Sequence, residues 1–159
     1  MSKWLYQGSN WEPTPEELEL YHAFVYCISN VATGKLYVGK KRMSTLRTLP
    51  PLKGQKKKRK VIKESDWREY TGSNDYLNAD IAASPPDAFK YEILHLCTTP
   101  AHSSYLEAKE QFLRGCLELS NDECYNGWIM ARINKTHLPI HKKPKPEKKP
   151  RTPRAKKVV

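Results

Sequence analysis

Two tyrosines, Tyr26 and Tyr37, stand eleven residues apart in two short apolar runs. A phenol with the ordinary pKa of ~10 is a poor base. Beside cations such as Lys40 or Lys41, its phenolate becomes more accessible, so that it can orient or deprotonate a water molecule. The alternative is that both tyrosines are core residues or cross-strand partners, which is the usual role of tyrosine in an alternating strand.

Basic residues are the second feature with chemical meaning. The net charge is +11 at pH 7, and the cations are concentrated in two runs. Residues 142–159 hold nine Lys or Arg and one acid, and residues 53–63 hold seven cations and no acid. Such runs attract polyanions without reading sequence, although a charge run can also be a solvated segment. Neither run belongs to an amphipathic helix with a broad apolar face, so a membrane surface is a poorer fit.

The cysteine pattern disfavours a zinc site. Cys27, Cys97, Cys116 and Cys124 include no C-x-x-C pair, and reduced thiols in a cytosolic protein explain them better. No stretch approaches the ~18 apolar residues of a membrane span, and the N-terminus lacks the apolar core of a secretory signal. We therefore expect a cytoplasmic protein with no membrane partner.

Several elements must position these side chains. Residues 14–21 predict a short helix, because Thr14 can cap it and a proline follows at the first helical position. Residues 23–29 and 35–39 are rich in β-branched and aromatic residues and predict a hairpin, with Gly34 supplying a positive φ.

The second half of the chain alternates helix and strand signals. We expect an irregular basic insertion at 43–66, a helix capped by Ser73 or Asn74, a strand at 89–97 and a helix at 103–119. Residues 125–133 are apolar but of uncertain type. Proline and lysine dominate towards the C-terminus, and no packed structure is expected there. The fold class is α/β (α+β), with a small, mainly antiparallel sheet, because the early hairpin excludes a doubly wound parallel fold.

The order of short motifs resembles one nuclease family. FVY at 24–26 and YVG at 37–39 are similar to the two-part motif of GIY-YIG nucleases, with Phe24 in place of glycine and valine in place of isoleucine. The motifs that follow look most like small phage proteins of this family, described as homing-endonuclease-like: W-x-x-Y-x-G-S-N, F-x-Y-E-I-L and YLEAKEQF.

The resemblance covers residues 22–134, and it implies a domain organisation. The implied nuclease domain is a three-stranded antiparallel sheet flanked by helices. A short extension would precede it at 1–21 and a basic Pro/Lys-rich tail would follow it at 135–159. The implied activity is metal-dependent cleavage of DNA, in the host cytoplasm if a phage encodes the protein.

The resemblance also implies catalytic residues. Tyr26 and Tyr37 would activate and position water, and Lys41 would assist. Asn126 would correspond to the family's asparagine near the end of the domain; taken alone, it is an ordinary turn residue before Gly127. The family's arginine is expected at Arg47, ten residues after Tyr37. Arg42 and Arg68 are the alternatives, and the competing explanation for Arg47 is a solvated cation in a basic loop.

A glutamate on a later helix would hold the metal, Mg²⁺ or Mn²⁺, which neutralises charge on the phosphoryl oxygens. Turning ~100° per residue places most apolar residues of 105–119 on one face, including Phe112 and Leu113. Glu110 then lies at the edge of that face and Glu107 on the far side. We therefore favour Glu110 by a small margin, while the YLEAK wording of the phage-type proteins favours Glu107.

The implied partner is DNA, expected to be double-stranded; no oligomeric state is indicated. Trp67, Tyr70 and Trp128 can stack on bases or pack in the core. Two other functions stay open: a nucleic-acid-binding protein without catalysis, and a structural or inhibitory phage protein whose tail docks an acidic partner. The residues expected to contact DNA are Lys40, Arg42, Lys56, Lys57, Lys58, Arg59, Lys60 and Arg68.

Overall fold

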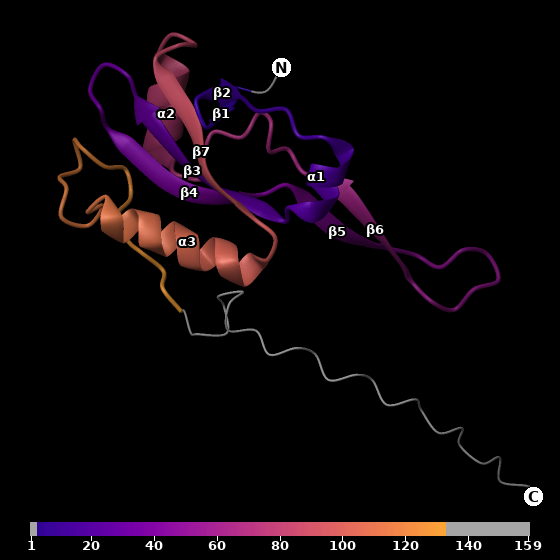
Figure 1. The fold of residues 1–159 in the computed structure, drawn as a ribbon. Helices are drawn as coiled ribbons and strands as arrows, with labels where there is room; N and C mark the ends of the chain where they lie inside the picture. The colour runs from indigo at the N-terminus through magenta and orange to yellow at the C-terminus, as the bar shows by residue number, and fades with distance from the viewer. Residues whose placement is uncertain (1–2, 133–159) are drawn as a thin grey trace, which may run out of the picture.

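The computed structural model describes residues 3–132. The expected basic tail at 135–159 lies outside the described residues. A five-stranded mixed sheet has the order β2-β1-β7-β3-β4, and a separate two-stranded hairpin pairs β5 with β6 (Figure 1). The strands are β1 (Trp4–Tyr6), β2 (Ser9–Asn10), β3 (Ala23–Asn30), β4 (Leu36–Arg42), β5 (Ser44–Leu49), β6 (Arg59–Glu64) and β7 (Phe89–Cys97). The helices are α1 (Pro15–Leu20), α2 (Asp75–Ala83) and α3 (Pro100–Leu113).

The predicted antiparallel core is confirmed, but the sheet is larger than expected. Strand β3 pairs antiparallel with β4 and with β7, and Gly34 adopts φ +75° in the β3–β4 turn. The expectation of three strands is wrong, because β1 adds parallel to β7 and β2 extends the sheet further. Strand β1 has only three residues, too few for an alternating pattern to reveal it.

Helix caps follow the local signals. Thr14 and Glu17 form a capping box at α1, and Asn74, one of the two expected caps, accepts a hydrogen bond from the Leu77 N–H at α2. Helix α3 begins at Pro100 behind the Thr99 cap and ends at Leu113, six residues earlier than expected. Gly115 follows with φ +61°, a left-handed conformation that stops a helix and suits glycine.

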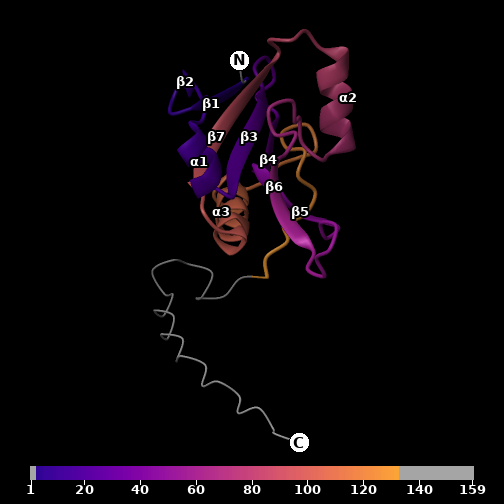
Figure 2. The same cartoon turned by 90° about the vertical axis from the view of Figure 1, so that its right-hand side faces the viewer.

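The expectation of an irregular segment at 43–66 is wrong for half of its length. Residues Ser44–Leu49 and Arg59–Glu64 pair as an antiparallel hairpin in which Arg47 lies opposite Val61. Lysine and proline are poor strand formers, and they obscured the alternating pattern of two short strands. In Figures 1 and 2 this hairpin projects beyond the five-stranded sheet.

The two faces of the sheet have different cores. One face carries an aromatic cluster that includes Trp4, Phe24, Tyr26 and Trp67, in which Trp4 donates its indole N–H to the Trp67 carbonyl at 2.9 Å. Helix α3 lies across the other face, over β7, β3 and β4 (Figure 2). The core beneath it is formed by Val25, Val38, Cys97, Leu106, Cys116 and Cys124. No helix within residues 3–132 is long and apolar enough to cross a membrane.

Candidate active site at the edge of the sheet

Strand β4 is an edge strand, and side chains from both faces of the sheet meet around it. Because successive residues of a strand point to opposite faces, Tyr37 and Lys40 leave β4 on different sides. A pocket of about 430 Å³ lies at this edge. It is lined by Tyr37, Lys40, Ser73, Asn74, Ser104, Glu107, Gln111, Tyr125, Asn126, Gly127, Trp128, Met130 and Arg132.

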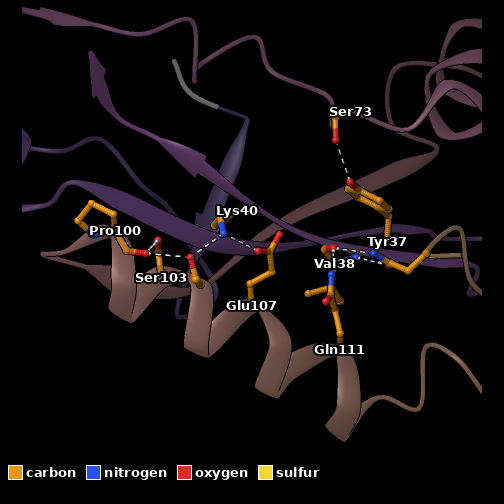
Figure 3. Close-up of polar contacts among 10 residues, drawn as sticks. Tyr37, Val38, Lys40, Ser73, Pro100, Ser103, Glu107 and Gln111 are labelled. Carbon is orange, nitrogen blue, oxygen red and sulfur yellow. Dashed lines mark hydrogen bonds and ion pairs between the residues drawn. The ribbon is translucent and has the colours of Figure 1, made fainter. Parts of the chain in front are cut away.

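Tyr37 enters the pocket from the aromatic side of the sheet. Its hydroxyl lies 3.1 Å from the Ser73 hydroxyl, in the segment before α2 (Figure 3). Burial raises the pKa of Tyr37, and Tyr70 and Glu107 raise it further, against the lowering effect of the hydrogen bond to Ser73. The expectation that neighbouring cations make this phenolate more accessible is therefore wrong for the folded chain, and the phenol stays protonated at neutral pH.

Tyr26 is buried in the aromatic cluster beside the pocket, with its ring centroid 6.2 Å from that of Tyr37. Burial, with Tyr37 and Tyr70 nearby, raises the pKa of Tyr26 well above its ordinary value. Gly39 lies directly opposite Tyr26 on β4, and a Cβ atom there would approach the Tyr26 hydroxyl to 2.6 Å. The glycine of the YVG motif therefore leaves room for the tyrosine of the FVY motif.

Glu107 reaches the pocket from α3. Its carboxylate lies 2.9 Å from the Lys40 Nζ, which also donates a hydrogen bond to the Ser104 hydroxyl at 2.8 Å. Figure 3 shows Glu107 and Gln111 projecting from α3 towards β4, with Tyr37 and Ser73 on the other side of the strand. Glu107 is the only acidic side chain among the described residues that line this pocket.

Glu110 lies away from the pocket, against β7. Its carboxylate contacts the His95 Nε2 at 2.5 Å and pairs with Arg114 one turn later on α3. Burial raises the pKa of Glu110, but the hydrogen bonds from His95 and Arg114 outweigh that effect and lower it overall. The expected helical face is wrong at Phe112 and Leu113, which are 58% and 69% exposed.

One face of α3 is polar and lies towards β4. The predicted arrangement of apolar residues around the helix did not reveal this face. Ser104, Glu107 and Gln111 recur at the spacing of three and four that places residues on one helix face. Gln111 is buried and donates to the Val38 carbonyl at 3.1 Å. This polar spacing is a sequence signal from which the position of Glu107 beside β4 could have been predicted.

Asn126 binds the outer edge of β4. Its side-chain oxygen accepts from the Val38 N–H and its amide donates to the Val38 carbonyl, each at 2.8 Å. The preceding residue, Tyr125, donates its N–H to the Leu36 carbonyl at 2.9 Å. Asn126 thus satisfies the backbone N–H and carbonyl of Val38 at the edge of β4 and fixes residues 125–128 in the wall of the pocket.

The predicted cations separate into three places. Lys41 leaves β4 on the aromatic side, where its Nζ lies 2.7 Å from an Asp66 carboxylate oxygen and 3.8 Å from the Tyr70 ring centroid. Arg42 lines a smaller adjoining pocket of about 220 Å³ that shares Lys40 and Ser104 with the first. Arg47 is exposed on β5, outside both pockets.

Arg68 and the basic run also lie outside the pocket. Arg68 pairs with Glu12 at 2.6 Å and with Glu64 at 3.2 Å, and these carboxylates raise its pKa. Lys56, Lys57 and Lys58 are exposed in the β5–β6 connection, and Arg59 and Lys60 are exposed at the start of β6.

Among the three candidate stacking residues, only Trp128 lines the pocket, and it is 68% exposed. Trp67 is fully buried, and Tyr70 packs on the aromatic cluster. The packing alternative therefore describes Trp67 and Tyr70, whereas Trp128 presents an indole to solvent beside Asn126.

The residues that line the pocket suit a divalent cation that takes few of its ligands from the protein. No cluster of three or more His, Cys, Asp or Glu able to hold a metal ion occurs within residues 3–132. Mg²⁺ does not require one, because it keeps several waters and binds through one or two carboxylates together with substrate phosphate oxygens. Glu107 can supply such a single carboxylate.

Comparison with known proteins identifies a family. A family model described as "Putative endonuclease segE, GIY-YIG domain" matches residues 4–130. The matched range begins in β1 and ends at Met130, one of the pocket-lining residues that follow Asn126. No curated protein and no solved structure matches the chain.

Proposed function

The chain belongs to the GIY-YIG nuclease family, and from this premise we propose that it is a metal-dependent endonuclease that hydrolyses phosphodiester bonds in double-stranded DNA. Its biological class would be a phage homing-type or DNA-processing nuclease. The observation that supports the proposal best is the convergence of Tyr37, Lys40 and Glu107 on one pocket at the edge of the sheet.

Glu107 is the proposed metal-binding residue. A bound Mg²⁺ or Mn²⁺ would neutralise charge on the phosphoryl oxygens and assist the leaving oxygen. Without substrate, Lys40 neutralises the Glu107 carboxylate at 2.9 Å. When DNA enters, the Lys40 ammonium is free to turn from Glu107 to a phosphate oxygen, because both groups are partly exposed and the lysine side chain is flexible.

Tyr37 is proposed to position the attacking water as a neutral phenol. Its raised pKa leaves the hydroxyl protonated at neutral pH, so it can donate to one oxygen while accepting from another. Ser73, 3.1 Å away, fixes the direction of that hydroxyl. Tyr26 is proposed to help position Tyr37, since the buried Tyr26 ring packs against the Tyr37 ring.

Among the three predicted arginines, Arg42 is the best placed to bind a phosphate next to the cleaved bond. It lines the adjoining pocket, and Lys40 and Ser104 line both pockets. A guanidinium can bind a phosphate through two parallel hydrogen bonds, which fixes its orientation. Asn126 is proposed to act by holding residues 125–128 in place, given its two hydrogen bonds to Val38.

A nicking assay with two matched variants tests the metal site. We expect wild-type protein to nick supercoiled plasmid with Mg²⁺ and not with EDTA. Glu107→Gln should lower the rate by ~10²-fold or more, because charge stabilisation at a transition state is usually worth that much. Glu110→Gln, the same change three residues later, should keep the wild-type rate constant among folded molecules.

Loss of nicking only in Glu110→Gln would overturn the assignment of the metal to Glu107. No nicking by the wild type, together with salt-dependent DNA binding, would favour a second function: a nucleic-acid-binding protein without catalysis. The Lys40–Glu107 ion pair and the raised pKa of Tyr37 are the observations that favour that alternative.

A further inference from the structure

The β5–β6 hairpin presents almost all of its side chains to solvent. Within residues 44–64, Ser44 and Leu49 are half-buried, all the others are exposed, and none is buried. Leu46 and Ile62, which lie opposite each other, are 60% and 71% exposed. The side chains on both faces of the hairpin are therefore available for contact with another molecule.

The charge of the hairpin indicates a polyanionic partner. Residues 44–64 carry eight Lys or Arg and one acid, Glu64. None of these eight cations pairs with a carboxylate within residues 3–132, whereas Glu64 at the base of the hairpin is paired with Arg68. This density of unneutralised cations also opposes edge-to-edge pairing with a second copy of the hairpin.

The dimensions of the hairpin suit the major groove of DNA. Two six-residue strands run antiparallel, which makes a ribbon ~20 Å long with strands ~5 Å apart. The major groove of B-DNA is ~12 Å wide and admits a two-stranded ribbon. Thr45, Lys63, Arg47 and Val61 form two neighbouring cross-strand pairs and therefore share one face.

We propose that the β5–β6 ribbon enters the major groove and reads base edges, with Arg47 contacting a guanine. Arginine can bind the O6 and N7 of guanine bidentately, threonine can bond to base edges, and valine can contact a thymine methyl group. The lysines of the connection, Lys56, Lys57 and Lys58, contact phosphates at the groove margin. The inference deepens the proposed function, since it rests on DNA being the substrate.

The ribbon is joined rigidly to the catalytic strand. Met43, between β4 and β5, is fully buried, and its N–H donates to the His22 carbonyl at 3.0 Å. Ser65, just after β6, donates its N–H to the Met43 carbonyl and its hydroxyl to the Arg42 carbonyl. These hydrogen bonds restrict rotation of the β5–β6 hairpin about its base relative to Lys40 on β4.

This connection limits where the read base can lie. Arg47 follows Lys40 by seven residues, which span at most ~25 Å when extended. Base pairs follow each other every ~3.4 Å along B-DNA, so, once the reach of the Lys40 and Arg47 side chains is added, the guanine lies within about one helical turn of the cleaved phosphate. The ribbon thus supplies a sequence preference close to the cut, which phosphate contacts alone do not provide.

The experiment uses the full chain carrying Glu107→Gln, so that binding is measured without cutting. A random DNA library is selected for binding, and the preferred site is probed with guanine N7 methylation, which blocks the major groove, and adenine N3 methylation, which blocks the minor groove. We expect interference from one or more N7-methylated guanines. Arg47→Ala should remove it at one guanine and reduce discrimination at that position by tenfold or more.

Lys60→Ala is the matched control, because it removes one charge from the opposite face of the same ribbon. It should weaken binding to all sequences about equally. The inference is overturned if no sequence is enriched, if only N3 methylation interferes, or if Arg47→Ala and Lys60→Ala weaken all DNA alike. It is also overturned if both leave DNA binding unchanged, which would assign the ribbon to a protein partner.

The outcomes also separate this inference from the proposed function. Suppose that N7 methylation of a guanine interferes with binding but the wild-type protein never nicks plasmid. That result would reject the nuclease activity and keep the ribbon as a reader of DNA. Nicking by the wild type without any N7 interference would keep the nuclease and reject the ribbon.

Discussion

Single side chains decide how closely the two tyrosine motifs approach each other. Tyr26 is buried and Tyr37 reaches the pocket, although both are strand tyrosines with raised pKa values. Gly39 makes this packing possible, because any side chain there would meet the Tyr26 ring. The motif glycine is thus required for close approach rather than for an unusual φ.

Gly39→Ala should therefore destabilise the fold. The added methyl would approach the Tyr26 hydroxyl to 2.6 Å and its ring carbon Cζ to 2.8 Å. Overpacking of this kind costs ~1–3 kcal/mol, which thermal or urea unfolding can measure. Gly127→Ala is the control, since no atom lies within 4 Å of its added Cβ. Equal stability of the two variants would show that the Tyr26 ring can move aside.

Glu110 should make stability dependent on acid pH. Because its folded-state pKa is lowered, its stabilising contribution is present above the unfolded pKa of ~4.3 and is lost as pH falls through the folded value. Glu110→Gln should lower the melting temperature near neutral pH, where His95 and Arg114 lose their carboxylate partner. The two melting temperatures should converge as pH falls below the unfolded pKa and through the lowered folded-state pKa of Glu110. A constant difference across that range would assign the loss to packing instead of charge.

At the scale of elements, hydrogen bonds link helix α2 and its N-terminal cap to the pocket-lining segment 125–128. Asn74 caps the helix by accepting from the Leu77 N–H at 3.0 Å. Its amide also donates to the Tyr125 carbonyl at 3.0 Å, so the cap holds the pocket-lining segment 125–128. The Tyr125 hydroxyl donates to the Asp80 carboxylate, which adds a second link between α2 and that segment.

Changes at Asn74 should separate these two roles. Asn74→Asp keeps the capping oxygen and removes the amide donor, so we expect near-normal stability with slower nicking. Asn74→Ala removes both and should cost ~1 kcal/mol or more in unfolding free energy. Thr14→Ala, which removes the cap of the remote helix α1, should lower stability without changing the rate. Equal nicking rates for all three variants would exclude a positioning role for Asn74.

At the scale of the whole molecule, charge is distributed very unevenly. Residues 142–159 carry a net charge of +8, which leaves +3 for the rest of the chain. Within that remainder, residues 44–64 alone carry a net charge of +7. We expect both segments to attract DNA at long range, and the β5–β6 ribbon also supplies two paired strands of the kind that can read base edges.

Removing residues 142–159 should weaken DNA binding for all sequences and flatten its dependence on salt. Each cation that neutralises a phosphate adds ~0.9 to the slope of log K against log salt concentration on B-DNA. Titrations at several salt concentrations give that slope for the full and shortened chains. An unchanged slope would mean that these cations do not contact DNA, while a changed sequence preference would contradict their assignment as non-specific.

The sequence by itself determined the parts of this protein that depend on neighbouring residues. The β3–β4 hairpin, the caps Thr14 and Asn74, and strand β7 were visible as alternation, turn residues and capping residues. Motif order was sufficient to indicate the family. These signals need no knowledge of which segments meet in space.

Tertiary structure alone decided the rest. The three residues of β1 form a strand because they pair with the edge of β7. The β5–β6 hairpin forms through cross-strand pairing that its lysine-rich composition did not indicate. Which of the two glutamates lies in the pocket depended on how α3 is rotated over the sheet: Glu107 pairs with Lys40 in the pocket, whereas Glu110 pairs with His95 and Arg114 away from it. A helical wheel gives the angle between two residues but not the direction in which a neighbouring strand lies, because that direction is set by long-range packing.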